Sequence, residues 1–223
     1  MSNHINTLGE VFAFLKELQH NNNREWFAAH KQQYDYLRDT WLNDLQSLIA
    51  QMSDYDPSLR GVQAKDCAYR IYRDIRFSAD KTPYKTYFSA VIGAKGRTTS
   101  KAADSLHLQP GKAGLYFGMW CPTPELLRSV RSLIDAEHQE LSQLLNAPDF
   151  ASRYQFEPFQ TLKRMPAGFD VNHPMADMIK AKDFTWGYPR PDNYFTSGDW
   201  VKRVADDMRH AKPIIDFLNY VFE

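Results

Sequence analysis

The sequence contains few of the features that mark secreted scaffolds and membrane proteins. Cys67 and Cys121 are its only cysteines, too few for a disulfide framework or a zinc cluster. No apolar run approaches the roughly 20 residues that a membrane-spanning helix needs. The longest run near the start, residues 11–15, is also too short for the apolar part of a signal peptide. We therefore expect a soluble cytoplasmic protein that does not enter a membrane.

Net charge is also absent, because 27 Lys and Arg residues balance 27 Asp and Glu residues over the 223-residue chain. This balance argues against a globally basic nucleic-acid coat. The apolar fraction of 43%, with 24% charged residues, is that of a globular protein rather than of a disordered chain.

The usual cofactor motifs are absent from the sequence as well. The glycines form neither a Walker loop nor a dinucleotide-binding fingerprint. The seven histidines lack metal-ligand spacing. The sequence therefore indicates no metal site, argues against ATP-dependent and NAD-dependent chemistry in their usual folds, and leaves any cofactor unknown.

Hydrophobic periodicity predicts an α+β fold. Apolar residues recur every three to four positions through residues 24–52, and again after Pro124 and after Trp200, as long helices require. Strands are expected at 67–77, 87–92, 105–109, 115–120 and 184–188. The first four strands follow one another without an intervening helix, which favours an antiparallel sheet of four or more strands. We expect the long N-terminal, middle and C-terminal helices to pack mainly on one face, within a single domain covering residues 1–223.

One segment concentrates basic charge. Between residues 60 and 101, ten basic residues accompany three acidic ones, which gives a local net charge of +7. Within it, residues 70–85 carry the motif R-x-x-R-D-x-R-F-x-x-D-K-x-x-Y-K. Guanidinium groups bind phosphate and carboxylate through paired hydrogen bonds, and lysines add point charges. The motif therefore predicts a pocket for a phosphate-bearing or carboxylate-bearing small molecule, with hydrolase or transferase chemistry as an extension.

The residues of the motif take roles according to their chemistry. The candidate binding residues are Arg70, Arg73, Arg76, Tyr84 and Lys85. Asp74 and Asp80 are candidates to orient the arginines, to bind Mg²⁺ beside a phosphate or to act as general bases. Lys81 would neutralise developing charge, so the two aspartates and this lysine are the candidate catalytic residues. Arg73 falls among apolar side chains in the alternating pattern. A guanidinium in such surroundings is costly, so Arg73 should meet a carboxylate or a bound anion.

Two other interpretations of the same segment stay open. In the first, Asp74 neutralises Arg70 and Arg76 in a structural salt network, and the protein is an interaction module. In the second, the aromatic residues that alternate with the cations form a stacking platform for single-stranded nucleic acid. Zero net charge places nucleic acid behind a small anion as the expected ligand, and the oligomeric state is left open.

Residues 70–85 closely resemble the signature of a bacterial family marked by a domain of unknown function, with some fungal relatives. Residues 21–27 resemble the N-terminal helix of that family, and residues 118–120 and 212–213 also match it. The resemblance therefore covers nearly the whole chain.

The resemblance implies that the Arg/Asp/Lys motif is a hallmark of the family. It also adds three candidates, Arg24, Trp26 and His30, that would line the same cleft as the motif. It implies neither a substrate nor an activity.

Overall fold

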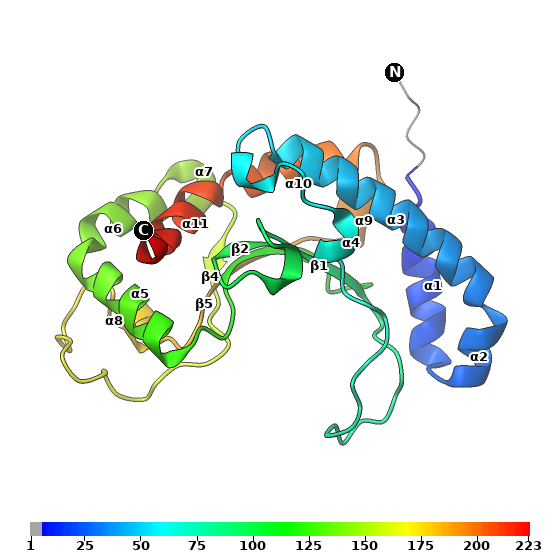
Figure 1. Cartoon of the computed structure of the whole chain (residues 1–223), viewed down its shortest axis with the longest axis horizontal. Coiled ribbons are helices and arrows are strands. Elements are labelled where there is room, and N and C mark those ends of the chain that lie inside the picture. The colour runs from blue at the N-terminus through cyan, green and yellow to red at the C-terminus, as the bar shows by residue number, and fades with distance from the viewer. Residues whose placement is uncertain (1–5) are drawn as a thin grey trace. The chain divides into compact units, whose positions relative to one another are not determined.

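A computed structural model describes residues 6–223, which form an α+β protein (Figure 1). The helices in this part of the chain are α1 (Leu8–His20), α2 (Arg24–Ala29), α3 (Lys31–Met52), α4 (Ala64–Cys67), α5 (Pro124–Ala136), α6 (His138–Leu145), α7 (Pro148–Ala151), α8 (Ala176–Lys180), α9 (Asp192–Thr196), α10 (Trp200–Arg209) and α11 (Lys212–Asn219). Short 3₁₀-helices occupy Pro57–Leu59, Gly96–Thr98 and Tyr220–Phe222. None of these helices is long and apolar enough to cross a membrane.

Five strands form one antiparallel sheet in the order β1-β2-β3-β5-β4. They are β1 (Phe88–Ile92), β2 (Ala103–Leu108), β3 (Gly114–Met119), β4 (Gln155–Phe156) and β5 (Phe184–Pro189). β4 pairs with β5, with Phe156 opposite Trp186. In β1 the buried residues Phe88, Ala90 and Ile92 alternate with half-buried ones, as expected for a sheet with one face in the core. The predicted α+β class and the antiparallel sheet are confirmed.

The strand predicted at 67–77 is wrong. Cys67 ends the short helix α4, and the chain beyond it pairs with residues 84–90 only through isolated bridges. The period of two is present in the sequence, but Pro83 on the opposite arm has no N–H to donate, so a continuous ladder cannot form there.

The single helix predicted at 24–52 is divided in two. α2 ends at Ala29 and α3 begins at Lys31. Between them, a ring nitrogen of His30 lies 2.8 Å from the carbonyl oxygen of Trp26. The apolar spacing continues across this break, so periodicity alone does not reveal it. The C-terminal helical segment is divided as well, since α10 ends at Arg209 and α11 begins at Lys212. Pro213 lies in the first turn of α11, where its missing N–H costs little.

The described chain divides into two compact units. The first is assigned residues 1–98, 105–115 and 189–206, of which those from residue 6 onward are described; the second comprises residues 99–104, 116–188 and 207–223. Each unit is therefore assembled from three separated stretches of sequence. The single domain over 1–223 stays a prediction.

The core of the first unit is aromatic and aliphatic. α1 packs against α3 and α9, and Trp41 of α3 lies 5.0 Å from the ring of Phe88 in β1. The indole of Trp200 donates a hydrogen bond of 3.3 Å to the buried carboxylate of Asp44. This bond joins residues 156 positions apart in the sequence, so the first unit depends on chain from both ends.

The second unit has an aromatic core of its own. Phe117 of β3 stacks on Trp186 of β5 with ring centroids 5.1 Å apart. Phe150 and Tyr154 then meet Phe117 edge-on. These rings hold α7 and the segment after it against the sheet.

Candidate functional site

The basic motif lies on a two-stranded excursion of the first unit, which we call the ribbon (residues 68–90). Figure 1 shows it as a long loop that leaves α4 and returns to β1. Bridges join Ala68 to Ala90 and Tyr72 to Tyr84 in antiparallel sense. The Lys85 amide also donates to the carbonyl of residue 71, at 2.7 Å. The two arms therefore stay together, although only residues 88–90, which belong to β1, form a regular strand.

Arg73 is the centre of a hydrogen-bond network at the tip of the ribbon. Its guanidinium forms an ion pair with Asp80 and donates to the hydroxyl and carbonyl oxygens of Thr82 and to the Ser78 hydroxyl. Asp80 also accepts the Thr82 N–H at 2.9 Å. Arg73 thus meets a carboxylate, one of the two partners that its position in the sequence requires. The network fixes the turn that precedes Pro83.

A second ion pair lies beside this network. Asp74 accepts two side-chain hydrogen bonds from Arg76, at 3.0 and 2.7 Å. Arg76 is the largest cause that lowers the pKa of Asp74 to about 2. The Thr82 N–H, followed by Arg73, lowers the pKa of Asp80 to about 2. Both carboxylates are therefore ionised at neutral pH and engaged with arginine.

The ribbon is attached to the turn between α1 and α2 by one asparagine. The Asn22 side chain donates to the Tyr84 carbonyl at 2.9 Å and accepts the Tyr84 N–H at 3.1 Å. The ring of Tyr84 stacks on Phe27 of α2, with centroids 4.0 Å apart, and burial raises the pKa of its hydroxyl. Tyr84 therefore has a structural role in the docking of the ribbon.

This docking creates a cleft of about 400 Å³. Residues from the α1–α2 turn and from both arms of the ribbon line it: Asn22, Asn23, Arg24, Ile75, Lys81, Thr82 and Pro83. We call it the Arg24–Lys81 cleft, after its two charged lining residues. The Lys81 ammonium donates one hydrogen bond of 3.0 Å to the Ile75 carbonyl, which leaves two further N–H donors on the same group. The residues that line the Arg24–Lys81 cleft include no Asp or Glu.

The remaining cations of the motif lie nearer the root of the ribbon. The Lys85 ammonium is 4.9 Å from the ring centroid of Tyr69 and 5.8 Å from that of Tyr87. Burial, followed by the charge of Arg70, lowers the pKa of Lys85. Within the described residues, neither Arg70 nor Lys85 forms an ion pair. The charge of Arg70 also acts on Asp74 and contributes to lowering the pKa of that carboxylate.

Two residues expected in the cleft lie outside its lining. Trp26 and His30 stack on each other along α2, with ring centroids 3.9 Å apart. Only Arg24 of the three candidates from the N-terminal segment lines the cleft with Lys81.

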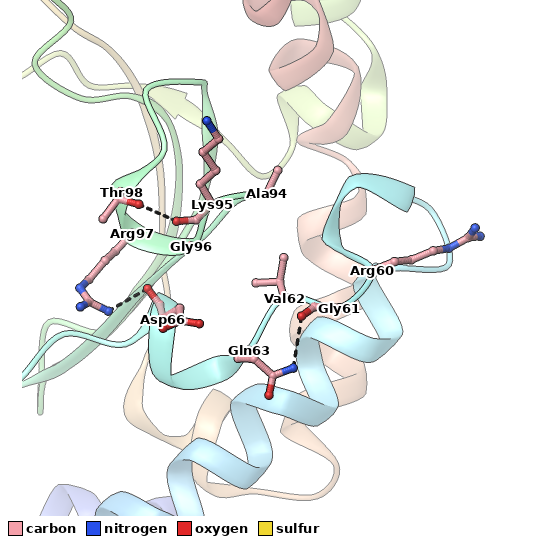
Figure 2. Close-up of a pocket in the computed structure, with 10 residues that line it drawn as sticks. All are labelled: Arg60, Gly61, Val62, Gln63, Asp66, Ala94, Lys95, Gly96, Arg97 and Thr98. Carbon is pink, nitrogen blue, oxygen red and sulfur yellow. Dashed lines mark hydrogen bonds between the residues drawn. The ribbon is translucent and has the colours of Figure 1, made fainter.

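A second cleft of about 400 Å³ lies in the first unit, between residues 60–66 and 94–98 (Figure 2). Arg97 donates to the carbonyl oxygen of Asp66 at 2.8 Å and to those of two neighbouring residues. Figure 2 shows Arg60 and Lys95 extending in different directions. Its cations do not converge, so this cleft is a weaker candidate than the Arg24–Lys81 cleft.

Metal-binding geometry is not found among residues 6–223. No group of three or more His, Cys, Asp or Glu side chains in this range is placed to hold a metal ion. His4, one of the seven histidines, lies outside the described residues.

Comparison with known proteins identifies the family of the chain. The family described as "Conserved hypothetical protein (DUF2461)" matches residues 10–217. The chain belongs to this family. No curated protein and no solved structure matches this DUF2461 chain. The resemblance noted on the basic motif and its flanking segments is therefore confirmed at the level of the family.

Sequence reasoning missed three residues that build the site of this DUF2461 protein. Asn22 joins the ribbon to the helical turn, Thr82 completes the tip network, and Phe27 supports Tyr84. The run of three asparagines was a signal for a helix cap, and Asn23 does cap α2 by accepting the Trp26 N–H. Nothing in the local sequence pattern indicates that Asn22 bonds the backbone of Tyr84, which lies 62 positions away.

Proposed function

We propose that this protein binds a small molecule with a phosphate or carboxylate group in the Arg24–Lys81 cleft. One observation carries the proposal: two basic side chains from segments far apart in the sequence line one cleft that has no acidic lining residue. An anion placed there would meet the Arg24 guanidinium and the free donors of the Lys81 ammonium.

The rest of the motif supports this cleft. Arg73 and Asp80 hold Thr82, a lining residue, and so keep the ribbon arm in place. Arg70, Arg76 and Lys85 contribute to a positive potential around the opening. Five basic and two acidic residues lie between 68 and 90, a net charge of +3.

The proposal assigns binding rather than a reaction. A general base works best when its pKa lies near the operating pH, whereas the pKa values of Asp74 and Asp80 are about 2. Hydrolase or transferase chemistry at neutral pH would therefore need a base other than these two carboxylates. We propose that they position the arginines, and that Lys81 binds the anion.

The tip network favours a second candidate function, an interaction module in which the salt network only stiffens the ribbon. The side-chain contacts of Arg73 named above all lie within the ribbon, as a structural role requires. Under this alternative, alanine at Arg73 would lower stability and no small anion would bind the wild type.

Thermal unfolding of the full chain tests the proposal. The panel is inorganic phosphate, pyrophosphate, sugar phosphates and dicarboxylates, each at two salt concentrations. A ligand at 100 times its Kd stabilises by about 2.7 kcal/mol, which raises the Tm of a chain of this size by about 5 to 10 °C. We expect Arg24→Ala and Lys81→Ala to abolish this shift. The matched control is Lys65→Ala, an exposed lysine of α4.

Two results would contradict the proposal. One is the absence of any shift across the panel. The other is a shift that Arg24→Ala and Lys81→Ala leave as large as Lys65→Ala does.

A further inference from the structure

We propose that the natural ligand is a single-stranded nucleic acid, with one phosphate in the Arg24–Lys81 cleft and bases stacked on the exposed aromatic side chains of the ribbon. This inference rests on the part of the proposed function that places a phosphate group in the cleft, and it replaces the small molecule by a nucleic-acid strand as the source of that phosphate. Four observations on the ribbon carry it.

The first observation is the exposure of aromatic rings. Phe77 at the tip is 96% exposed, and Tyr72 and Tyr69 are 45% and 39% exposed. A single exposed apolar residue needs no explanation. Three aromatic residues within nine positions of one projecting ribbon are different, because burying a ring of this size would gain about 1.5 to 3 kcal/mol. The ribbon therefore presents rings that a partner can cover.

The second observation is that cations accompany these rings. The Arg76 guanidinium lies 5.8 Å from the ring centroid of Phe77, and the Lys85 ammonium lies 4.9 Å from that of Tyr69. Rings beside cations are the pattern of proteins that bind single strands, in which bases stack and phosphates are neutralised. A neutral apolar partner would use the rings but would offer no anion to the Lys85 ammonium.

The third observation is the charge that remains on the ribbon. Asp74 and Asp80 are both engaged with arginines of the ribbon, so they do not oppose an incoming phosphate as free carboxylates would. The 23 residues of the ribbon keep a net charge of +3, and Arg70, Arg76 and Lys81 among its cations are exposed. This charge complements a polyanion, although the whole chain is neutral.

The fourth observation links the rings to the cleft. The ring of Tyr72 lies 5.5 Å from that of Tyr84 and 6.0 Å from that of Phe27. These are the rings that dock the ribbon beside Asn22, which lines the cleft. Tyr72 is therefore held close to the side of the ribbon where the phosphate would bind. A duplex keeps its bases stacked inside, so a single strand is the form that can use these rings.

The test is fluorescence anisotropy with a labelled oligothymidylate of about ten nucleotides, within the site sizes known for such proteins. For about three phosphate contacts, affinity should fall about 20-fold between 50 and 200 mM salt. Phe77→Ala should weaken binding by about 5-fold to 100-fold, because it removes one stacking platform. Phe77→Trp should restore the affinity. The matched control is Phe159→Ala, which removes another exposed phenylalanine ring, 68% exposed and beside Trp120, in the second unit.

A second probe separates this inference from the proposed function. An abasic oligonucleotide of the same length keeps the phosphates and lacks the bases. We expect it to bind more weakly than oligothymidylate to the wild type and equally to the wild type and Phe77→Ala.

The proposed function and this inference predict different results in these experiments. If phosphate or pyrophosphate binds in the cleft but oligothymidylate binds no tighter than its abasic form, the proposed function stands and this inference is overturned. If oligothymidylate binds through Phe77 but Arg24→Ala and Lys81→Ala do not weaken it, the cleft has no part and the inference also fails. If the protein binds anionic vesicles through Phe77 and does not bind the oligonucleotide, the rings belong to a membrane-binding surface and this inference is overturned as well.

Discussion

At the scale of single residues, Asp74 and Asp80 show how neighbouring carboxylates of the same type depend on different donors. Arg76 dominates the environment of Asp74, whereas the Thr82 N–H is the largest influence on Asp80. Both pKa values are depressed, so the folded state binds these protons less readily than the unfolded state. The stability that the two carboxylates contribute is therefore fully present at pH values above 3.8, the ordinary pKa of an aspartate. It is lost as the pH falls toward about 2.

Removal of the arginine partners should raise the two pKa values by different extents. In Arg76→Ala the pKa of Asp74 should rise from about 2 toward 3.8, because the largest cause of its depression, the Arg76 side-chain donor, is gone and the N–H of residue 76 remains. In Arg73→Ala the pKa of Asp80 should rise less, because the Thr82 N–H remains. Carbon-detected NMR titration of the carboxyl groups measures both values. A full return of Asp80 to 3.8 in Arg73→Ala would contradict the assigned order of causes.

Gly118 is a residue for which the backbone allows no side chain. Its φ is +132°, and a Cβ atom there would lie 1.9 Å from the carbonyl oxygen of Phe184. We expect Gly118→Ala to lower the free energy of unfolding by about 3 kcal/mol or more, which lowers Tm by about 6 to 12 °C. Gly111→Ala is the matched control, since its φ is +74° but no atom lies within 4 Å.

Gly111→Ala should cost only the left-handed backbone penalty, about 1 to 2 kcal/mol. Thermal unfolding of the two variants under one set of conditions gives the comparison. Equal losses would mean that the close approach of β5 to Gly118 does not matter.

At the scale of elements, the ribbon is held on the helices of the first unit by Asn22 and by the rings of Tyr72 and Tyr84 against Phe27. Asn22 satisfies both the N–H and the carbonyl of Tyr84, as an adjacent strand would. The tip network is local, since Arg73 and Thr82 are nine positions apart. The shape of the tip therefore depends on its own residues, and the position of the ribbon depends on Asn22.

Removal of the Asn22 side chain should release the ribbon without unfolding the protein. We expect Asn22→Ala to cost about 1 to 2 kcal/mol, because the Tyr84 backbone loses both partners in a half-buried position. The Tyr84 amide should then exchange with solvent faster than amides in α3. Hydrogen exchange followed by NMR is the measurement.

Asn21→Ala is the control for this variant. Its side chain only donates to the Glu17 carbonyl at the exposed end of α1, so its loss should cost less than about 0.5 kcal/mol. Protection of the Tyr84 amide that is equal in both variants would show that Asn22 is not the anchor.

The elements also show what sequence patterns can predict here. Period-two apolar residues predict β1, β2, β3 and β5, since one face of each enters the core. The same period at 67–77 is misleading, because aromatic and basic residues alternate there on a ribbon whose opposite arm contains Pro83. The break at His30 depends on one contact between a ring and a carbonyl. Periodicity does not register such a contact.

The two cations of the cleft were among the predicted residues, but the uncharged residues that build it and its assembly were not. The motif supplies Lys81, and resemblance to the family supplies Arg24. The tip network and the docking by Asn22 depend on tertiary contacts that composition and spacing do not contain. For the same reason, Trp26 and His30 were placed in a cleft that they do not line.

At the scale of the whole molecule, the two units are interleaved along the chain. The first unit needs residues 189–206 to supply Trp200, whose indole bonds the buried Asp44. We therefore expect the fragment 1–98 not to fold alone, and the full chain to unfold in one cooperative transition. Calorimetry of the full chain and circular dichroism of the fragment measure these properties. A fragment with a cooperative melting transition would contradict the expectation.

The separation of Asp44 and Trp200 also sets an order of events during synthesis. The tip of the ribbon can close soon after residue 83 leaves the ribosome, because its partners span only residues 73–82. Asp44 meets the Trp200 indole only when most of the chain has been made. Because the chain emerges N-terminus first, the ribbon tip can be complete before residues 189–206 have been made. The core of the first unit is still incomplete at that stage. We therefore expect a nascent chain that stalls before residue 200 to be more exposed to proteases and chaperones than the finished protein.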